Sequence, residues 1–525
     1  MDSLALVATI STPQAAMEID KVPNAVSWLQ IRTDLIGDIP GEWLRSHFSG
    51  RLLYTLRSYA ASGKFDRSKS ERHQRLIAAA RDFDLVELEA DADLIPELVD
   101  AVPASKRMIV WRGESCAAGQ LESRFLEMAR IPARYYCVLP RADKASDGLQ
   151  PLLLLKALKR TDVVAYCDGP AGLWSQLLSP SIGSPLIFGN SHAALPRTGE
   201  MQVQQLIGDY GFPAVPPLRE IYGMVGTRIL QSPSPRLHNM AYRILNYPAR
   251  FLPFQVEQFE DFWKKMVECG FAESLGLAIQ GLVIVSPFKE TALAVAGESS
   301  FMVKRAGASN VFVRKNGTWK AETTDPETIA NVKNICPMKA AVIGCGGAGR
   351  AVAAALQQIG SEVTLVNRGL RRGQYAVQLL SLPFVPLSEF RANGFNLIVN
   401  ATPVGKENDG FPFIIDSLSN GTTVIDLAYG PRPTPLVSAV LARGGTAIDG
   451  YNVLLTQVRK QFQLLTGLEM PGDIGRDVVL GDNAEHFSSL ESVLQTPQGM
   501  AICECNLQMD PKREWCGPRD TNESR

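Results

Sequence analysis

The chain has 525 residues, too many for one ordinary domain, so two or three domains are expected. Its content of 46% hydrophobic and 20% charged residues is typical of a globular protein that folds in water. The formal net charge of -1 argues against a broad electrostatic surface for nucleic acid, and no basic run with interleaved aromatic residues is found.

The first part of the chain alternates strand-like apolar runs with helical segments such as 69–81 and 122–129. About eight such units in roughly two hundred residues are typical of a small (β/α)8 barrel. An open, doubly wound sheet is the alternative arrangement of the same units. The predicted strands are Leu4–Ile10, Ser27–Arg32, Arg51–Arg57, Phe83–Ala90, Lys106–Arg112, Ala133–Leu139, Asp162–Tyr166 and Pro185–Phe188.

A proline-rich joint at Pro213–Pro217 marks a domain boundary, after which a new strand-like run begins at Glu220–Val225. A second α/β unit follows, and Lys339 opens a third. The segment Val453–Leu465 is predicted to be helical, and the polar stretch after Gly481 predicts a mobile tail. We therefore expect a barrel at residues 1–215, a second α/β domain at 216–335 and a Rossmann domain at 336–448. Helices that return to the second domain are expected at 449–480, and a tail at 481–525.

A glycine-rich turn joins a strand to a helix in the third unit. The apolar strand Ala340–Ile343 leads into this turn, and a helix of small residues follows at Arg350–Ile359. Glycines at such a turn let backbone N–H groups approach a pyrophosphate at the helix N-terminus. A further strand at Glu362–Val366 completes the pattern of a dinucleotide site, for which a plain tight turn is the alternative. The residues expected to line the cofactor here are Gly344, Gly346, Gly347, Ala348 and Gly349.

The residues after the second strand of this unit indicate which dinucleotide binds. NAD-binding domains usually place Asp or Glu there, against the 2′-hydroxyl of the ribose. This chain instead has Asn367-Arg368-Gly369-Leu370-Arg371-Arg372. Guanidinium groups suit a 2′-phosphate because they form bidentate, charge-assisted hydrogen bonds. Asn367, Arg368 and Arg372 therefore predict NADP, and a solvated basic turn is the alternative.

Several short motifs fall in one order along the chain. They are Ser-Pro-Ser-Pro-Arg-Leu-His-Asn at 232–239, Ser-Pro-Phe-Lys-Glu at 286–290, Gly-Ala-Ser-Asn at 307–310, Thr-Thr-Asp at 323–325, Asn-Ala-Thr-Pro-Val-Gly at 400–405, Asp-Leu-Ala-Tyr at 426–429, and Gln457. In this order and spacing, residues 222–479 resemble shikimate dehydrogenase. The resemblance implies an NADP-dependent oxidoreductase that interconverts 3-dehydroshikimate and shikimate. The substrate would be a shikimate-like cyclohexene carboxylic acid.

The resemblance also implies roles for single residues. Reduction of a ketone by hydride needs a proton donor at the new alkoxide, and the family uses a Lys–Asp pair that falls here on Lys289 and Asp325. Ser232 and Ser234 match the serines that bind the substrate carboxylate, and in an extended strand both hydroxyls would face one side. Further positions that match substrate contacts are Asn310, Tyr429 and Gln457. Further positions that match cofactor contacts are Asn400, Thr402 and Gly450.

Four residues depart from the family pattern. The family usually shows Asn-Val-Thr-x-Pro before the lysine, and Val283 and Val285 replace its asparagine and threonine. Gln231 stands where a histidine is usual, and Thr323 replaces an asparagine. A lost contact leaves a substrate group unpaired, at a cost of about 1–3 kcal/mol. A quinate-like or otherwise altered cyclohexane acid is therefore an alternative substrate.

The barrel half resembles type I 3-dehydroquinate dehydratase over residues 4–212. The clearest stretch is 172–180, which runs on to Ile187-Phe188-Gly189, and residues 29–34, 54–57 and 86–89 match earlier strand ends. That family dehydrates its substrate through a Schiff-base lysine and a histidine acid/base.

The catalytic groups of that family are missing from the matching positions. The lysine should fall near Tyr135 and the histidine near Gly113. Gln176 replaces a carboxylate-binding arginine and Gln30 replaces a glutamate, although Arg32, Arg57 and Glu89 are retained. Because an imine cannot form without an amine, we expect a barrel that is inactive as a dehydratase and serves as a scaffold, a ligand sensor or a different enzyme.

The leading interpretation is therefore an NADP oxidoreductase fused to an inert barrel. A bifunctional dehydratase–dehydrogenase and a non-catalytic sensor that binds NADP and a shikimate-like acid are the alternatives.

The start Met1-Asp2-Ser3-Leu4-Ala5 lacks a basic region, apolar runs are too short for a bilayer, and nine cysteines show no metal-ligand spacing. We expect a cytoplasmic protein with no metal and no membrane or nucleic-acid partner.

Overall fold

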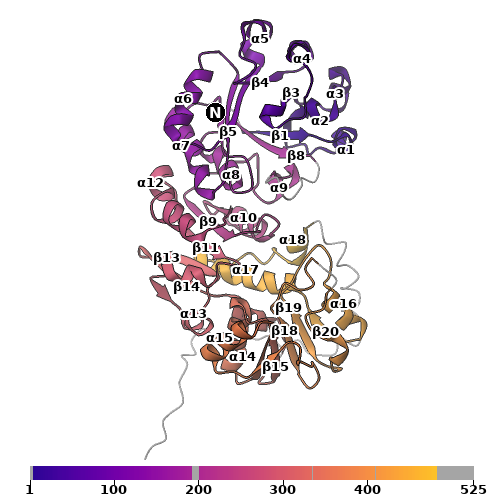
Figure 1. The fold of residues 1–525 in the computed structure, drawn as a ribbon, viewed down its shortest axis with the longest axis vertical. Coiled ribbons are helices and arrows are strands. Elements are labelled where there is room, and N and C mark those ends of the chain that lie inside the picture. Colours follow the sequence, from indigo (N-terminus) through magenta and orange to yellow (C-terminus); the bar gives the residue numbers. More distant parts are fainter. Residues whose placement is uncertain (1–3, 192–199, 334, 408–409, 482–525) are drawn as a thin grey trace, which may run out of the picture.

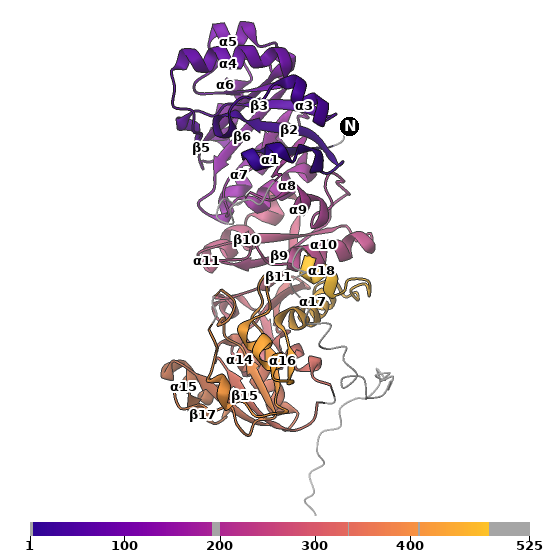
Figure 2. The same ribbon diagram turned by 90° about the vertical axis from the view of Figure 1, so that its right-hand side faces the viewer.

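The computed structural model describes residues 4–191, 200–333, 335–407 and 410–481, so the predicted tail lies outside the described residues except for Gly481. Three β-sheets follow one another along the chain, and they are stacked along the long axis of the molecule, as Figure 1 and Figure 2 show. Within the described ranges, no helix combines the length and the apolar character needed to cross a bilayer.

The first sheet has eight parallel strands in the order β7-β6-β5-β4-β3-β2-β1-β8. Because β1 pairs with both β2 and β8, the sheet curls into a barrel, and the predicted (β/α)8 fold is confirmed. The barrel is nearly closed, since no ladder joins β7 to β8 in the described part of the chain. Its strands are β1 (Ala5–Ile10), β2 (Val26–Arg32), β3 (Arg51–Thr55), β4 (Leu85–Glu89), β5 (Arg107–Glu114), β6 (Tyr135–Arg141), β7 (Val163–Ala165) and β8 (Leu186–Asn190).

Helices cover the outside of the barrel between successive strands. They form where an N-cap precedes apolar residues spaced three or four apart, as in α4, where the Ser68 hydroxyl accepts from the Glu71 N–H and Leu76 and Ala79 are buried. The helices of this half are α1 (Pro13–Met17), α2 (Thr33–Ile36), α3 (Gly41–His47), α4 (Lys69–Asp82), α5 (Pro96–Ala101), α6 (Ala118–Met128), α7 (Leu149–Leu158), α8 (Leu173–Ile182) and α9 (Val203–Gly208).

The second sheet has six strands in the order β10-β9-β11-β13-β14-β12. The parallel pairing of β9 with β10 and β11 places the loops after these strands at one edge of the sheet. Its strands are β9 (Glu220–Gly226), β10 (Ala249–Gln255), β11 (Ala278–Ile284), β12 (Glu298–Ser299), β13 (Val311–Lys315) and β14 (Thr318–Glu322). Its helices are α10 (Ser234–Ile244), α11 (Phe259–Phe262), α12 (Phe271–Leu275), α13 (Phe301–Ala306) and the 3-10 helix η7 (Asp325–Asn331).

The third sheet is parallel throughout, in the order β17-β16-β15-β18-β19-β20. The strand order reverses on either side of β15, and ligands bind in the crevice at such a reversal. Its strands are β15 (Lys339–Ile343), β16 (Glu362–Asn367), β17 (Phe384–Pro386), β18 (Leu397–Asn400), β19 (Thr423–Asp426) and β20 (Thr446–Ile448). Its helices are α14 (Gly347–Gln358), α15 (Leu370–Leu380) and α16 (Pro435–Ala442).

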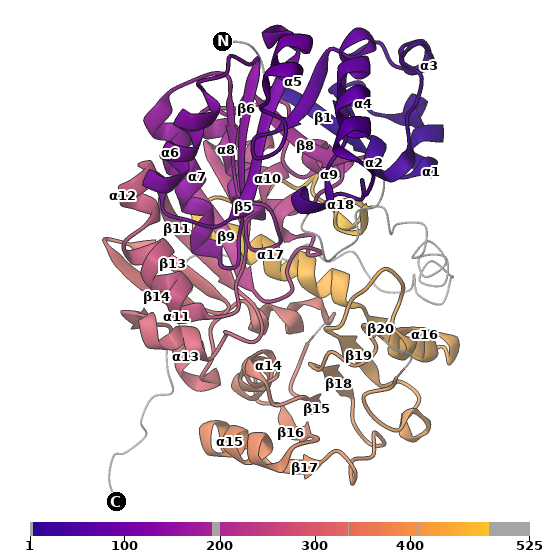
Figure 3. The ribbon, with the colours of Figure 1, turned by 45° about the horizontal axis from the view of Figure 1, so that its top comes forward.

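A long helix, α17 (Gly450–Thr466), returns the chain from the third sheet to the second, and α18 (Arg476–Leu480) follows it. Asp449 caps α17 by accepting hydrogen bonds from the backbone N–H groups of Tyr451 and Asn452. The buried face of α17, including Val458 and Phe462, packs in one apolar cluster with residues of the second sheet. Figure 3 shows α17 lying between the two sheets.

The barrel packs directly on the second sheet. The ring of Trp174 on α8 lies 5.6 Å from that of Phe254 and 5.3 Å from that of Phe271, measured between centroids. Arg250 of β10 donates a hydrogen bond of 2.8 Å to the carbonyl oxygen of Leu177 on the same barrel helix. One continuous apolar cluster therefore spans the barrel and the second sheet.

The second and third sheets are joined by the buried guanidinium of Arg350. This side chain, on α14, is 0% exposed. It donates to the carbonyl oxygens of Ala306 at 2.6 Å and Cys345 at 2.9 Å, and to the Glu290 carboxylate at 3.0 Å. These partners belong to the end of α13, to the glycine-rich turn and to the loop after β11, so one side chain ties all three together.

We predict that Arg350→Met will lower the free energy of unfolding of the dehydrogenase half by about 3–5 kcal/mol, because buried carbonyl groups lose their donor. Urea denaturation measures the loss, and hydrogen exchange of α13 and α14 locates it. The exposed Arg130, with no side-chain partner among the described residues, provides the control Arg130→Met, which should change stability by less than about 0.5 kcal/mol. Equal effects of the two substitutions would contradict this account.

Candidate active site

The predicted Lys–Asp pair is formed in the space between the second and third sheets. The ammonium of Lys289, in the loop after β11, lies 2.8 and 3.0 Å from the two carboxylate oxygens of Asp325. The side chains are 16% and 3% exposed, respectively. Asp325 opens η7, just after the antiparallel hairpin β13–β14. The pair is therefore sheltered, and only the lysine end is partly open to solvent.

Three neighbours hold Asp325 in place, two at its carboxylate and one at its backbone N–H. The Asn310 amide donates to Asp325 Oδ1 at 3.2 Å and to Thr324 Oγ1 at 3.0 Å. Gln457 of α17 donates to the same carboxylate oxygen at 3.4 Å. Thr323, which departs from the family pattern, accepts a hydrogen bond from the Asp325 N–H. The predicted substrate residues Asn310 and Gln457 thus lie beside the pair, where they orient Asp325.

The glycine-rich turn lies directly on the lysine. A methyl group at Gly347 would sit 3.4 and 3.6 Å from Cβ and Cδ of Lys289, so the turn and the lysine stem are in contact. Gly349 is required for the turn itself, since a Cβ there would meet the Gly344 carbonyl oxygen. Around Gly346, by contrast, no atom lies within 4 Å of the Cβ position. This open side at the N-terminus of α14, which also includes Ala348, fits a pyrophosphate.

Two arginines beside this turn have no partner among the described residues. Arg368 and Arg372 are exposed and form no side-chain hydrogen bond or ion pair there. The positive charge of Arg372 acts on the Cys345 thiol. Burial raises the pKa of this thiol to about 11, and the charges of Arg350 and Arg372 oppose the rise. Asn367 accepts a hydrogen bond from the Cys345 N–H at 3.1 Å, which fixes the end of β16 against the turn. The arrangement fits a dinucleotide with a 2′-phosphate.

The predicted cofactor residues of the third sheet have structural partners. The Asn400 amide donates to Asp426 at 2.8 Å and accepts from the Thr402 hydroxyl at 2.7 Å. A Cβ at Gly450 would meet the Ala428 carbonyl oxygen at 2.5 Å, so only glycine fits at the start of α17. Burial raises the pKa of Asp426 to about 6, against its hydrogen bonds. These residues shape the loops at the carboxyl edge of the third sheet, on the cofactor side of the cleft.

The serine pair does not lie on an extended strand, so the prediction of its local structure was wrong. Ser234 is the first residue of α10, and Ser232 lies in the turn before it. The two hydroxyls are nevertheless adjacent, because the turn brings Ser232 Oγ to 3.2 Å from Ser234 Oγ. Tyr429 approaches from the third sheet: burial raises the pKa of its phenol, and a hydrogen bond with Ser232 opposes that rise. Hydroxyls from both sheets therefore meet at one point.

The two valines that depart from the family pattern occupy different surroundings. Val283 is 3% exposed and belongs to the apolar core of the second sheet. Val285 is half-buried, and its side chain lies against Gly226, where a Cβ would come within 2.4 Å of it. Gly226 ends β9, whose following loop leads to Ser232. Val285 therefore packs against the end of β9, whereas Gln231 is exposed.

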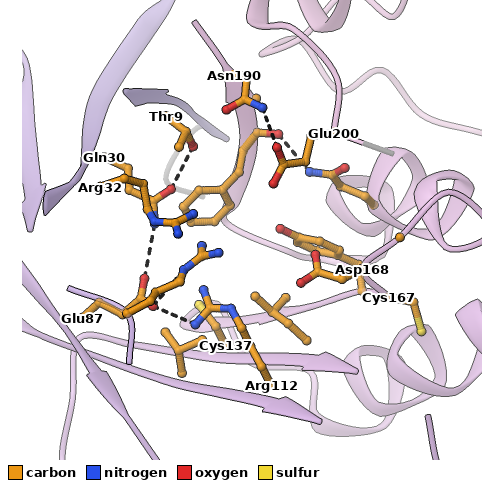
Figure 4. A pocket seen from close by; sticks show the side chains of 18 of the residues that line it. Thr9, Gln30, Arg32, Glu87, Arg112, Cys137, Cys167, Asp168, Asn190 and Glu200 are labelled. Atoms are coloured by element: carbon orange, nitrogen blue, oxygen red, sulfur yellow. Dashed lines mark hydrogen bonds and ion pairs between the residues drawn. The ribbon is translucent and has the colours of Figure 1, made fainter. Parts of the chain in front are cut away.

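A second site-like feature, a cavity of about 720 Å³ including its open mouth, lies in the barrel. Figure 4 shows the charged and polar side chains that point into it. The polar lining residues are Thr9, Gln30, Arg32, Arg57, Glu87, Arg112, Cys137, Tyr166, Cys167, Asp168, Gln176, Asn190 and Glu200. No lysine or histidine is among the described residues that line the cavity.

Position along each strand, as well as the alternation of side chains, decides which residues line this cavity. Glu87 lines it, whereas Glu89, two residues further on at the end of β4, accepts from Ser58 and pairs with Arg72 at 3.0 Å. Arg112 lines it rather than its neighbour Gly113, and Cys137 and Leu139 line it rather than Tyr135 at the start of β6. Sequence reasoning missed Glu87, Arg112 and Asp168. The period of two along β5 is the signal that would have found Arg112.

Two family models match the chain, one over the barrel and one over much of the second sheet. The type I 3-dehydroquinase family matches residues 7–213, and the shikimate dehydrogenase substrate binding domain matches residues 224–312. A bifunctional 3-dehydroquinate dehydratase/shikimate dehydrogenase from Arabidopsis thaliana is 24% identical over 508 residues, which cover 89% of this chain and 83% of the relative.

Relatives of the second half alone are more similar. A shikimate dehydrogenase (NADP(+)) from Haloarcula marismortui is 32% identical over 264 residues, 48% of this chain and 96% of the relative. The crystal structure of shikimate 5-dehydrogenase from Thermus thermophilus in complex with NADP(H) and shikimate is 27% identical, with a TM-score of 0.45, over 51% of this chain and 99% of that one. The chain therefore belongs to the shikimate dehydrogenase family through its C-terminal half, which follows a domain of the type I 3-dehydroquinase family.

Proposed function

We propose that the C-terminal half is an NADP-dependent oxidoreductase that interconverts 3-dehydroshikimate and shikimate. The observation that supports this most directly is the contact of the glycine-rich turn with Lys289, whose ammonium is held by the buried carboxylate of Asp325. A dinucleotide on this turn would lie beside a fixed proton donor, which is what the reduction of a ketone requires. The NADP(+)-dependent relatives support the same assignment.

The chain's own residues account for binding and proton transfer in this reaction. The exposed Arg368 and Arg372 would hold the 2′-phosphate, and the open side at Gly346 would take the pyrophosphate. Bound NADPH supplies the hydride. Lys289 then donates a proton from Nζ to the oxygen of the new alcohol, while Asp325 holds the ammonium in place before the transfer. In the opposite direction Lys289 accepts that proton.

The substrate carboxylate fits the hydroxyls of Ser232, Ser234 and Tyr429, which converge from both sheets. Val285 offers no hydrogen bond where the family has a threonine, so the polar contacts to the substrate differ and a quinate-like acid is a second candidate substrate. Turnover of shikimate and quinate compared on one enzyme preparation distinguishes the two.

We also propose the domain division 1–215, 216–335, 336–448 and 449–480, because each break separates the strands of one sheet from the elements that follow.

For the barrel we propose that it does not dehydrate 3-dehydroquinate through an imine. An imine needs an unprotonated amine on the barrel wall, and the described lining supplies guanidinium groups, which stay protonated. The family lysine should fall near Tyr135, where Cys137 and Leu139 of the same strand line the cavity, and Gln176 cannot pair with a carboxylate as an arginine fork does. Gln176 instead donates to the Phe188 carbonyl oxygen at 2.8 Å.

The unmodified protein should use NADP in preference to NAD. Replacing Arg368 and Arg372 together by alanine removes two charge-assisted contacts to the 2′-phosphate, so the KM for NADP should rise roughly 10- to 100-fold. The KM for NAD and the KM for shikimate are the internal controls, because neither ligand has that phosphate. Equal use of NADP and NAD by the unmodified protein would contradict the assignment.

Lys289→Met should lower kcat on the order of a hundredfold or more, the range of a positioned acid/base group, without loss of NADP binding. Steady-state kinetics and cofactor fluorescence measure the two effects separately. Lys304, exposed on α13 and without a side-chain contact among the described residues, supplies the matched control Lys304→Met. Near-normal turnover of Lys289→Met, or an equal loss in Lys304→Met, would refute the role.

Incubation of the full chain with 3-dehydroquinate and borohydride should give no covalent adduct on residues 4–212, and no enone absorbance above the background. Intact-mass measurement and peptide mapping read out the adduct. The variant Cys137→Lys, which places an amine among the residues that line the cavity, tests whether trapping is sensitive enough to report one. An adduct on the unmodified barrel would show that another residue acts as the Schiff-base amine.

A further inference from the structure

The barrel cavity contains charges that the dehydrogenase chemistry does not use. Arg32, Arg57 and Arg112 enter it from the ends of β2, β3 and β5. Two carboxylates compensate this side: Asp34 pairs with Arg32 at 2.8 Å, and Glu87 pairs with Arg112 at 2.7 Å. Three guanidinium groups against two carboxylates leave this wall of the cavity with one uncompensated positive charge.

That uncompensated charge belongs to Arg57. Its Nε lies 3.6 Å from Glu87, and its guanidinium forms no hydrogen bond among the described residues. The oxygens of Glu87 are already taken by Arg112, by Gln30 at 3.2 Å and by Thr55 at 3.1 Å. Burial, with repulsion from Arg112 and Arg32, lowers the pKa of Arg57 to about 10. An anionic ligand group between Arg57 and Arg112 would relieve that repulsion.

The opposite wall of the cavity is acidic. Asp168, directly after β7, lines the cavity, and in the described part of the chain no side chain donates a hydrogen bond to its carboxylate. Figure 4 shows it across the cavity from Arg32 and Glu87. Asp168 forms no ion pair within 4.0 Å with either arginine of the opposite wall, although both charges act on it. A buried carboxylate without a partner is costly, and a cation compensates it best.

Between these walls the lining is apolar. Met108, Val110, Leu139 and Phe188 come from β5, β6 and β8. The cavity therefore has a cationic wall, an acidic wall and a hydrophobic surface. A simple anion would leave Asp168 uncompensated, and a simple cation would leave Arg57 uncompensated. A ligand with both charges and an apolar substituent satisfies all three parts.

We propose that the barrel cavity reversibly binds a small zwitterion, an α-amino acid with an apolar side chain. Its carboxylate lies between Arg57 and Arg112, its ammonium faces Asp168, and its side chain contacts Val110 and Phe188. A hydroxy acid of the same shape would pair with the arginines equally well, but its neutral hydroxyl compensates Asp168 less than a cation does. The site is separate from the dehydrogenase cleft, so its occupancy and the turnover of shikimate are independent measurements.

Calorimetric titration of the full chain tests the proposal with matched pairs of probes. L-leucine and L-phenylalanine are each compared with the hydroxy acid that replaces the ammonium by a hydroxyl, L-leucate and L-phenyllactate. At least one amino acid should bind about tenfold or more tightly than its hydroxy-acid counterpart. If neither amino acid binds up to its solubility limit, or if the hydroxy acids bind equally well, the proposal is overturned.

Two variants assign the charges. Asp168→Asn should weaken the amino acid about tenfold or more and abolish its advantage over the hydroxy acid, whereas Arg57→Gln should weaken both probes of a pair. The exposed Asp143, with no side-chain contact among the described residues, gives the matched control Asp143→Asn, which should bind like the unmodified protein. Undiminished binding by Asp168→Asn would overturn the proposal. Far-UV circular dichroism and thermal unfolding, each like those of the unmodified protein, show that the barrel is folded in all three variants.

The proposal also predicts a pH dependence. Burial raises the pKa of Asp168, although Arg112 and Arg57 lower it, and an ammonium ligand needs this carboxyl ionised. Affinity for the amino acid should therefore fall as the pH is lowered through that pKa, and binding near it should release a proton. The other titratable groups that face Asp168 are Arg57 of the β3 end, Glu87 of β4, Arg112 of β5, Cys137 of β6, Tyr166 after β7 and Glu200 after β8. Comparison of the heats of binding in two buffers measures the proton released on binding. An affinity that does not change with pH in Asp168→Asn is the control.

Discussion

The arrangement of the dehydrogenase half depends on the buried guanidinium of Arg350. A charged group with no exposed surface is stable only when all of its donors are used, and here its donors are shared among α13, the glycine-rich turn and the loop after β11. That loop contains Lys289, so the side chain that ties the sheets together also sets the turn against the lysine stem. The cofactor site and the proton donor are positioned by the same residue, which itself takes no part in the chemistry.

The two halves of the chain use buried charge in opposite ways. In the dehydrogenase cleft, Lys289 and Asp325 are matched one to one, and Asn310 and Gln457 use the remaining acceptor positions of the carboxylate. In the barrel, Glu87 is surrounded by more donors than it needs: burial alone would raise its pKa, but Arg112 and Arg57 lower it to about 2. The first arrangement is complete before a substrate arrives, whereas the second leaves charge for a ligand to neutralise.

Much of the fold could be predicted from the sequence, because parallel strands buried on both faces appear as continuous apolar runs. The eight barrel strands and the two strands on either side of the glycine-rich turn were found from such runs. The order of strands around the barrel, which separates a closed barrel from an open sheet, depends on contacts between distant segments and needed the ladders β1–β2 and β1–β8. The pair Lys289 and Asp325 was found through a family resemblance, since spacing alone does not bring residues 36 positions apart together.

The cavity was harder to predict than the cleft. A shift of one residue along a strand moves a side chain from the cavity to the outer face, which is why Arg112 was overlooked in favour of Gly113. Glu87 and Glu89 are two residues apart, so alternation does not separate them, and only the position of the cavity along β4 shows that Glu87 lines it. Asp168 follows a strand of three residues, too short for its alternation to be read from the sequence. The prediction of an extended strand at Ser232 and Ser234 failed for another reason. A proline follows each serine, and this pattern favours a turn and a helix start over an extended strand.

The helix α8 serves two surfaces at once. One side of it supplies Gln176 to the cavity, and its other side supplies Trp174 and Leu177 to the contact with the second sheet. Removal of the barrel would uncover Phe254 and Phe271, aromatic side chains that are fully buried in the complete chain. Substitutions that face the cavity can therefore leave this contact intact, whereas the C-terminal half on its own would present an apolar, aromatic surface to water.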